Sequence, residues 1–213
     1  MFDRAAASKG LLYVIAAPSG AGKTTLVRVL TESLPNIMVS ISHTTRNRRP
    51  NEKDGEDYFF ISKSEFEKLS QKDDFLEYAT VFNQLYGTSK SAVEQKLSGG
   101  TDVILEIDWQ GHQQIKQLMP ECISIFILPP SLEILRDRLV KRDQDHPDII
   151  EQRLSDVRET VSHLPEFDYV VINDDFTRAL HDLKIIIESG RLTKHRQIAR
   201  HRDLINSLLH IDD

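Results

Sequence analysis

Several features that define other protein classes are scarce in this 213-residue chain. It has one cysteine, Cys122, which cannot form an internal disulfide and is expected to pack in the core, since an apolar run follows it. No apolar run approaches the ~18 residues of a membrane span, and residues 1–9 lack the apolar segment of a signal peptide. The net charge is −6, which argues against nucleic acid or an anionic membrane as a partner. The chain is therefore predicted to be cytoplasmic.

What is present is an alternation of short apolar runs and helical patterns, which predicts an α/β fold with a central parallel sheet flanked by helices. The expected core strands are 11–17, 37–41, 103–107, 123–128 and 169–172. The expected helices are 23–34, 111–118, 131–141, 147–164 and 176–191. The basic stretch 191–202, with the leucines around it, is expected to form one amphipathic C-terminal helix.

Two stretches interrupt this alternation. Residues 42–100 are polar with short strand-like pieces at 58–61 and 75–78, and they are too long for a loop, so they predict an inserted lobe. A second, smaller insertion is expected between residues 139 and 155, where 141–146 are charged and show no apolar period. An exposed corner and a mobile lid over a phosphate site both fit this second pattern.

The most informative segment is APSGAGKT at 17–24, between an apolar run and a helical pattern. Gly20 and Gly22 let backbone N–H groups turn inward, and the helix start adds its positive dipole end, so the segment predicts a phosphate cradle, or P-loop. Lys23 can then reach the terminal phosphates of a nucleotide, and the Thr24 hydroxyl can help to hold Mg²⁺. The motif begins with alanine where the usual pattern has glycine. A glycine-rich turn with no ligand is the alternative, which the Lys-Thr pair disfavours.

Three arginines crowd into residues 46–49 with no acid beside them in the sequence. Adjacent like charges repel, so such a cluster favours a clamp for a second phosphate. Tyr58 and Tyr86 have hydroxyls that could join this clamp, although each taken alone is more often a core residue.

Asp108 follows the predicted strand 103–107, and ligands of open α/β sheets bind at the carboxyl ends of strands. A carboxylate there can hold Mg²⁺ or its waters. The alternative is a helix N-cap, and the two uses are compatible.

Arg138 and Arg142 share one helix face at i, i+4, and Arg153 lies across the second insertion. Basic residues at a helix end complement the helix dipole, which is the simpler interpretation of Arg142 alone. Three arginines around one corner near a nucleotide site instead favour a clamp on the transferring phosphoryl group.

Over residues 10–209 the chain resembles guanylate kinase of the bacterial type. The matching stretches, in order, are APSGAGKT (17–24), SHTTRNRRP (42–50), GEDYFF (55–60), FLEYA (75–79), LYGTS (85–89), LEIDWQG (105–111), IFILPPS (125–131) and VIND (171–174). The P-loop alone would not distinguish this family from other nucleotide kinases, but the order and spacing of the remaining motifs do.

The resemblance implies an ATP-binding P-loop core at 10–41, 99–136 and 156–209, a GMP-binding lobe at 42–98 and a lid at 137–155, after a tail at 1–9. The implied ATP-binding residues are Ser19, Gly20, Ala21, Gly22, Lys23, Thr24, Thr25, Arg138 and Asn173. The GMP phosphate would contact Arg46, Arg49, Tyr58 and Tyr86, the guanine would contact Ser42, Glu77 and Thr88, and Glu106 would lie between the nucleotides. The implied catalytic residues are Lys23, Asp108, Arg142 and Arg153, with Mg²⁺ held by Thr24 and Asp108, directly or through water.

The implied reaction is Mg²⁺-dependent transfer of the γ-phosphoryl group of ATP to GMP or dGMP. A kinase for another nucleoside monophosphate is one alternative. A non-catalytic interaction domain that binds a phosphopeptide is another, but such domains lack the P-loop lysine and lid arginines that this chain keeps. Lys141 and Asp143 replace the usual lid glycines, which puts the flexibility of the lid in question. A homo-oligomer through the core or the C-terminal helix stays open.

Overall fold

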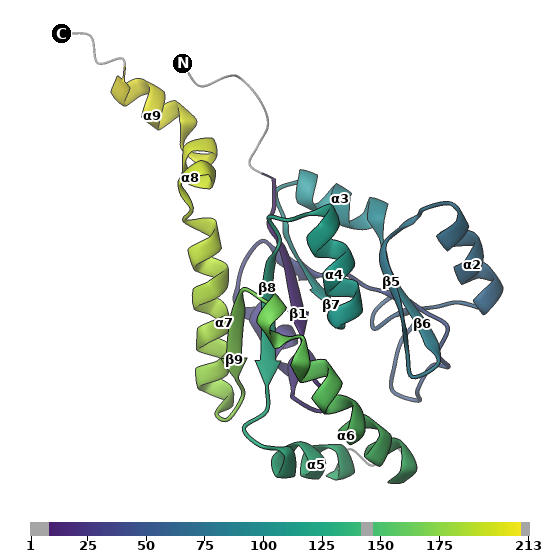
Figure 1. Ribbon diagram of the computed structural model, residues 1–213. Coiled ribbons are helices and arrows are strands. Elements are labelled where there is room, and N and C mark those ends of the chain that lie inside the picture. Colours follow the sequence, from purple (N-terminus) through teal and green to yellow (C-terminus); the bar gives the residue numbers. More distant parts are fainter. Residues whose placement is uncertain (1–8, 142–146, 210–213) are drawn as a thin grey trace.

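The computed structural model describes residues 9–141 and 147–209, with the backbone alone for 141 and 147–153. Five parallel strands form the central sheet in the order β2-β7-β1-β8-β9 (Figure 1). The strands are β1 (Leu12–Ala16), β2 (Ile37–Val39), β7 (Asp102–Glu106), β8 (Ile123–Leu128) and β9 (Tyr169–Ile172). The predicted α/β fold class is confirmed.

Helices cover both faces of this sheet, because its inner strands are apolar on both sides. α1 (Lys23–Ser33) and α7 (Phe176–Arg191) pack on one face, against the odd-numbered residues of β1. α3 (Lys90–Ser98) and α4 (Trp109–Leu118) pack on the other, against the even-numbered residues. The pleat of a single strand thus divides the core into two layers.

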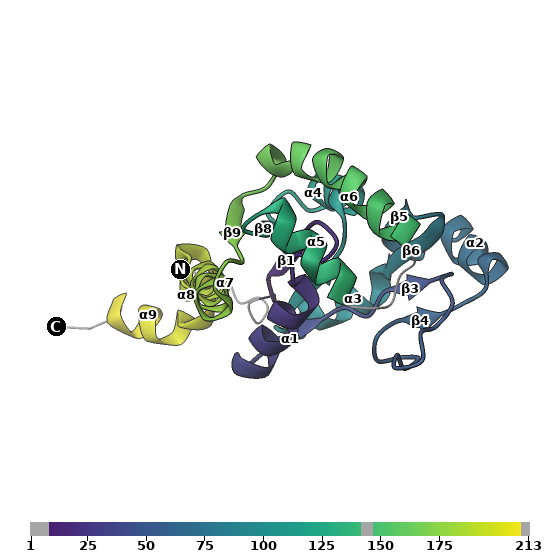
Figure 2. The ribbon, with the colours of Figure 1, turned by 90° about the horizontal axis from the view of Figure 1, so that it is seen from below.

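A second, four-stranded sheet, in the order β4-β3-β6-β5, forms a separate lobe beside the first; its strands are labelled in Figure 2. Its elements are β3 (His43–Thr44), β4 (Phe59–Phe60), α2 (Lys63–Gln71), β5 (Phe75–Val81) and β6 (Gln84–Ser89). Phe82 and Asn83 join β5 to β6 with φ values of 48° and 60°, and positive φ at both positions is typical of a tight hairpin turn. Phe66 packs on Phe75 with ring centroids 4.5 Å apart, which gives the lobe its own apolar centre.

α5 (Leu132–Lys141) and α6 (Pro147–Ser162) lie beyond the carboxyl ends of the central strands (Figures 1 and 2). Leu135 and Leu139 of α5 pack with Val157 of α6 in a small cluster of their own. These two helices therefore meet each other at the edge where ligands of parallel sheets bind.

The helix predicted at 147–164 is present as α6, which ends two residues earlier, at Ser162; a 3₁₀ turn follows at Leu164–Glu166, where Pro165 has no N–H for a helical ladder. The prediction of a single C-terminal helix is wrong. The C-terminal stretch forms two helices, α8 (Lys194–Arg200) and α9 (Arg202–Leu209), and nothing in the sequence explains the break between them. Among the described helices, none is long and apolar enough to cross a membrane.

Asp102 ties the start of β7 to the C-terminal helices. Its buried carboxylate accepts the Leu11 N–H at 2.7 Å and the Nε of Arg191 at 2.8 Å. The guanidinium of Arg196 on α8 lies 3.5 Å from the same carboxylate. One buried charge thus has two arginine partners, which is how a buried carboxylate is tolerated.

Candidate active site

The loop between β1 and α1 has the shape of an anion site. Gly20 and Gly22 have φ values of 89° and 92°, in the left-handed region that glycine enters without strain. Gly22 is also the N-cap of α1, so the cap residue itself offers no side-chain hydrogen bond to the N–H groups of the first turn. These groups and the positive end of the helix favour a bound phosphate.

Arg138 and Asn173, both expected at the ATP site, lie against this loop. Arg138 donates from Nη1 to the carbonyl of Ala21 at 3.3 Å and from Nη2 to the carbonyl of Asn173 at 3.2 Å. The Asn173 amide donates to the same Ala21 carbonyl at 2.7 Å. A β-carbon at Gly20 would lie 3.0 Å from Leu139, so α5 packs directly over the loop.

Lys23 and Thr24 share one carboxylate partner. The Nζ of Lys23 lies 3.9 Å from Glu106 Oε2, and the Thr24 hydroxyl donates to that oxygen at 3.1 Å. Burial lowers the pKa of Lys23, while the negative charges of Glu106, Asp108 and Glu77, in that order, oppose the shift. Negative charges from two acids after β7 and from one carboxylate of the lobe therefore favour the protonated form of the P-loop lysine.

Asp108 is the N-cap of α4, as the alternative interpretation predicted. Its Oδ1 accepts the Gly111 N–H at 3.0 Å, and its Oδ2 accepts from the Gln110 amide at 3.2 Å. Burial raises its pKa. The cap fixes this carboxylate near Lys23, so it remains a candidate for the metal role as well.

The predicted guanine-reading residues form one hydrogen-bonded group in the lobe. Glu77 on β5 pairs with Thr88 on β6, and the Thr88 hydroxyl donates to Glu77 Oε1. The Ser42 hydroxyl lies 3.5 Å from that of Thr88. Glu77 is only 3% exposed, and burial raises its pKa to about 7. A buried carboxylate held in this way can accept hydrogen bonds from a ligand, so Glu77 is a candidate for the predicted role.

The arginine clamp has an acid that the sequence reasoning missed. Arg46 Nη2 donates to Glu52 Oε1 at 2.7 Å, and the Arg49 N–H donates to Glu52 Oε2 at 2.9 Å. The cluster has no acid next to it in the sequence, but in the folded loop Glu52 is its acidic partner. The i, i+3 spacing of Arg49 and Glu52 could have indicated this pairing. Tyr58 and Tyr86 lie together as expected, with ring centroids 5.9 Å apart and the Arg46 guanidinium 5.5 Å from the Tyr58 ring.

Comparison with known proteins places this arrangement in a family. Residues 9–190 match the guanylate kinase family. The chain belongs to that family. A curated guanylate kinase from Methylococcus capsulatus is 51% identical over 202 residues, covering 95% of this chain and 99% of the relative. One from Alcanivorax borkumensis is 53% identical over 203 residues, covering 95% and 98%. The crystal structure of guanylate kinase from Anaplasma phagocytophilum has a TM-score of 0.79 at 32% identity, covering 97% of this chain and 98% of that one. The resemblance drawn from the motifs is confirmed.

The structure does not describe the side chains of two arginines that the guanylate kinase motifs predict at the lid. Arg142 lies outside the described residues, and Arg153 lies on α6 in the part where only the backbone is described. Their roles remain predictions from the sequence.

The end of α6 is fastened to the start of α4 by ring stacking. The Trp109 and His163 rings lie 3.7 Å apart between centroids and are inclined by 6°. The Nδ1 of His163 lies 2.6 Å from Glu166 Oε1, and Gln113 donates to the other oxygen of Glu166 at 3.0 Å. This junction joins the C-terminal end of α6, whose first half belongs to the predicted lid, to the helix that Asp108 caps.

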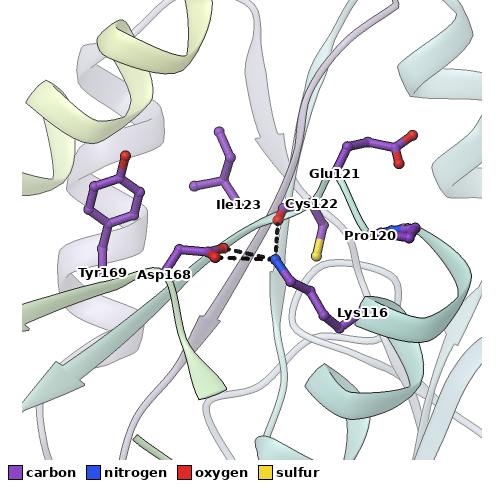
Figure 3. Close-up of a pocket in the computed structure, with 7 residues that line it drawn as sticks. All are labelled: Lys116, Pro120, Glu121, Cys122, Ile123, Asp168 and Tyr169. Carbon is purple, nitrogen blue, oxygen red and sulfur yellow. Dashed lines mark hydrogen bonds and ion pairs between the residues drawn. The ribbon is translucent and has the colours of Figure 1, made fainter. Parts of the chain in front are cut away.

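A pocket of about 460 Å³ lies at the opposite, amino end of β8 and β9 (Figure 3). Lys116 spans it and donates to both the Cys122 carbonyl, at 3.1 Å, and the Asp168 carboxylate, at 3.0 Å. Cys122 is buried, as predicted, and burial raises the pKa of its thiol to about 11. This end of the guanylate kinase fold is therefore held by internal contacts, and its thiol is poorly reactive at neutral pH.

Proposed function

We propose that this guanylate kinase transfers the γ-phosphoryl group of ATP to GMP or dGMP, with ATP on the P-loop and GMP in the lobe. One observation carries the proposal: Gly111 of α4 donates its N–H to Asp108 at 3.0 Å and lies directly against the buried Glu77 carboxylate, since a β-carbon there would be 2.5 Å from Glu77 Oε2. The carboxylate suited to reading a guanine therefore lies beside the first turn of α4, which Asp108 caps at the end of β7.

Base selection follows from hydrogen bonding. Guanine presents an imino N–H and an amino group side by side, and the Glu77 carboxylate can accept from both. Adenine has a bare ring nitrogen and no amino group there, so it would leave a buried carboxylate without donors. In comparable sites such a mismatch costs about 10⁴-fold in kcat/KM.

The transfer needs charge and alignment more than a general base, because the acceptor phosphate oxygen is already ionised near pH 7. The difficulty is to bring two polyanions together, which cationic groups on both sides can do. We assign Arg46 and Arg49 to the acceptor phosphate, and Lys23, Arg142 and Arg153 to the transferring group. Closure of the lid would also keep water from acting as the acceptor.

The residues beside the P-loop fit a magnesium ion. Mg²⁺ prefers oxygen ligands and is bound through one or two protein groups plus waters and substrate phosphates. The Thr24 hydroxyl and the Glu106 carboxylate supply such oxygens 3.1 Å apart, and Asp108, the N-cap of α4, supplies a second carboxylate. When bound with ATP, the ion would neutralise charge on the β- and γ-phosphates. Thr24 would hold it, with Asp108 acting directly or through water.

We further propose the cytoplasm as the compartment and no nucleic acid as a partner, in keeping with one cysteine and a net charge of −6.

A panel of acceptors tests the proposed function. ADP release is measured with GMP, dGMP, AMP and UMP, each with Mg²⁺ and with excess chelator. We expect turnover with GMP and dGMP only, and only with the metal. Faster turnover with AMP or UMP would indicate another monophosphate kinase. No turnover with any acceptor, combined with binding of a phosphopeptide, would support an interaction domain.

A further inference from the structure

β5, which carries Glu77, is the edge strand of the lobe sheet. Gln114 of α4 pairs with its outer side at Tyr78 as a neighbouring strand would. The Gln114 Oε1 accepts the Tyr78 N–H at 3.1 Å, and its Nε2 donates to the Tyr78 carbonyl at 2.8 Å. Both backbone groups of the residue after Glu77 are thus held by one side chain of the core.

Gly111 lies one helical turn before Gln114, on the same face of α4. A β-carbon at Gly111 would lie 2.5 Å from Glu77 Oε2 and 3.2 Å from its Cδ. The residue sits in the first turn of the helix and does not have positive φ, so alanine would suit the backbone and be favoured by about 1 kcal/mol. The close approach of the Glu77 carboxylate explains why glycine stands here.

We propose that Gly111 and Gln114 are positioning residues for guanine recognition, which hold the Glu77 carboxylate in the orientation that accepts the two guanine donors. This inference rests on the proposed function. Gln114 fixes the strand next to Glu77, while Gly111 leaves the space that its carboxylate occupies. Since Asp108 caps the same helix, α4 also sets the distance from the base-reading carboxylate to the acids beside the P-loop.

A purely structural role, in which α4 only docks the lobe onto the core, predicts something different. The loss of Gln114 would then lower stability, and its effect on kinetics would not depend on Glu77. A positioning role predicts that the effect of Gln114 disappears once Glu77 can no longer accept both donors.

The experiment is a double-mutant cycle of Gln114→Ala and Glu77→Gln, with kcat and KM measured for GMP and for ATP. Gln113→Ala is the matched control, because it removes the same type of side chain from the preceding position of α4, where the amide donates to Glu166 instead. In the wild-type background we expect Gln114→Ala to lower kcat/KM for GMP roughly ten-fold, with KM for ATP unchanged. In the Glu77→Gln background the further loss should stay within about two-fold, as should the effect of Gln113→Ala alone.

Gly111→Ala provides a second, independent test. A displaced carboxylate should lower kcat/KM for GMP about 10²-fold and narrow the discrimination against AMP, again without a change in KM for ATP. Equal losses from Gln114→Ala in both backgrounds, or GMP kinetics unaltered by it, would overturn the inference while leaving the proposed function intact. A wild-type protein that does not phosphorylate GMP would overturn both.

Discussion

Replacing Glu77 with glutamine should stabilise the ligand-free protein and at the same time impair its use of GMP. Burial raises the pKa of Glu77 from 4.5 to about 7, so the folded protein holds this proton more tightly than the unfolded chain does. Stability therefore falls as the pH rises from about 4.5 to about 7, by an amount that corresponds to roughly 3 kcal/mol. Glutamine is neutral at every pH and escapes this penalty, while its carbonyl can still accept from Thr88.

We expect Glu77→Gln to be more stable than the wild type by roughly 1–3 kcal/mol at pH 8 and no more stable near pH 4. With GMP as acceptor, the NH₂ group of the glutamine would lie opposite a guanine N–H, so that two hydrogen-bond donors meet and no bond forms. The loss in kcat/KM should be at least ~10²-fold, because such a buried mismatch costs about 1–3 kcal/mol or more. ATP binding should be nearly unchanged, since Glu77 belongs to the lobe.

Urea denaturation at both pH values measures the first effect, and steady-state kinetics with GMP and AMP measure the second. Glu94→Gln is the control, since it makes the same change on the exposed surface of α3 and should alter stability by less than about 0.5 kcal/mol. A variant no more stable than the wild type at pH 8 would contradict the burial argument. Unaltered GMP kinetics would mean that the guanine is read elsewhere.

Three further predictions concern the remaining charges. Lys23→Ala should lower kcat/KM by well over ten-fold, or more than ~1.4 kcal/mol, with an unchanged circular dichroism spectrum; a smaller loss would contradict the role of this lysine at the phosphates. Arg46→Ala should weaken GMP binding but not ATP binding in calorimetric titrations, whereas Arg153→Ala should mainly lower kcat. If Arg46→Ala weakened ATP binding alone, the assignment of Arg46 to the GMP phosphate would be wrong. Asp102→Ala should destabilise the protein by roughly 3 kcal/mol in urea, because Arg191, Arg196 and the Leu11 N–H lose their shared carboxylate; a cost below about 1 kcal/mol would show that water replaces it.

The central sheet could be predicted from the sequence because buried parallel strands are continuous apolar runs. The runs that became β8 and β9 coincide with the predicted ranges, and the others differ by two residues or fewer at each end. The two-residue strands β3 and β4 are too short to show a period, so their pairing could not be predicted.

Only those parts of the candidate site that belong to a local sequence motif could be predicted. The P-loop and the segment around Glu77 are such motifs, but the residues that orient them are not. Gln114 lies 36 residues from the strand that it holds, and an isolated glutamine on a helix has no pattern to mark it. Glu52 was near in sequence, yet only the folded loop shows that its carboxylate lies between two arginines.

The stacked pair at the junction of α4 and α6 has an optical consequence. Trp109 is the one tryptophan of the 213 residues, so all indole fluorescence of this protein originates there. Its ring lies against the imidazole of His163 and directly follows the residue that caps α4. Emission excited near the red edge of protein absorption is therefore a label-free signal from a single point, where the C-terminal end of α6, the helix that begins in the predicted lid, meets α4. Stopped-flow mixing with each nucleotide could time the movement of that junction without the addition of any dye.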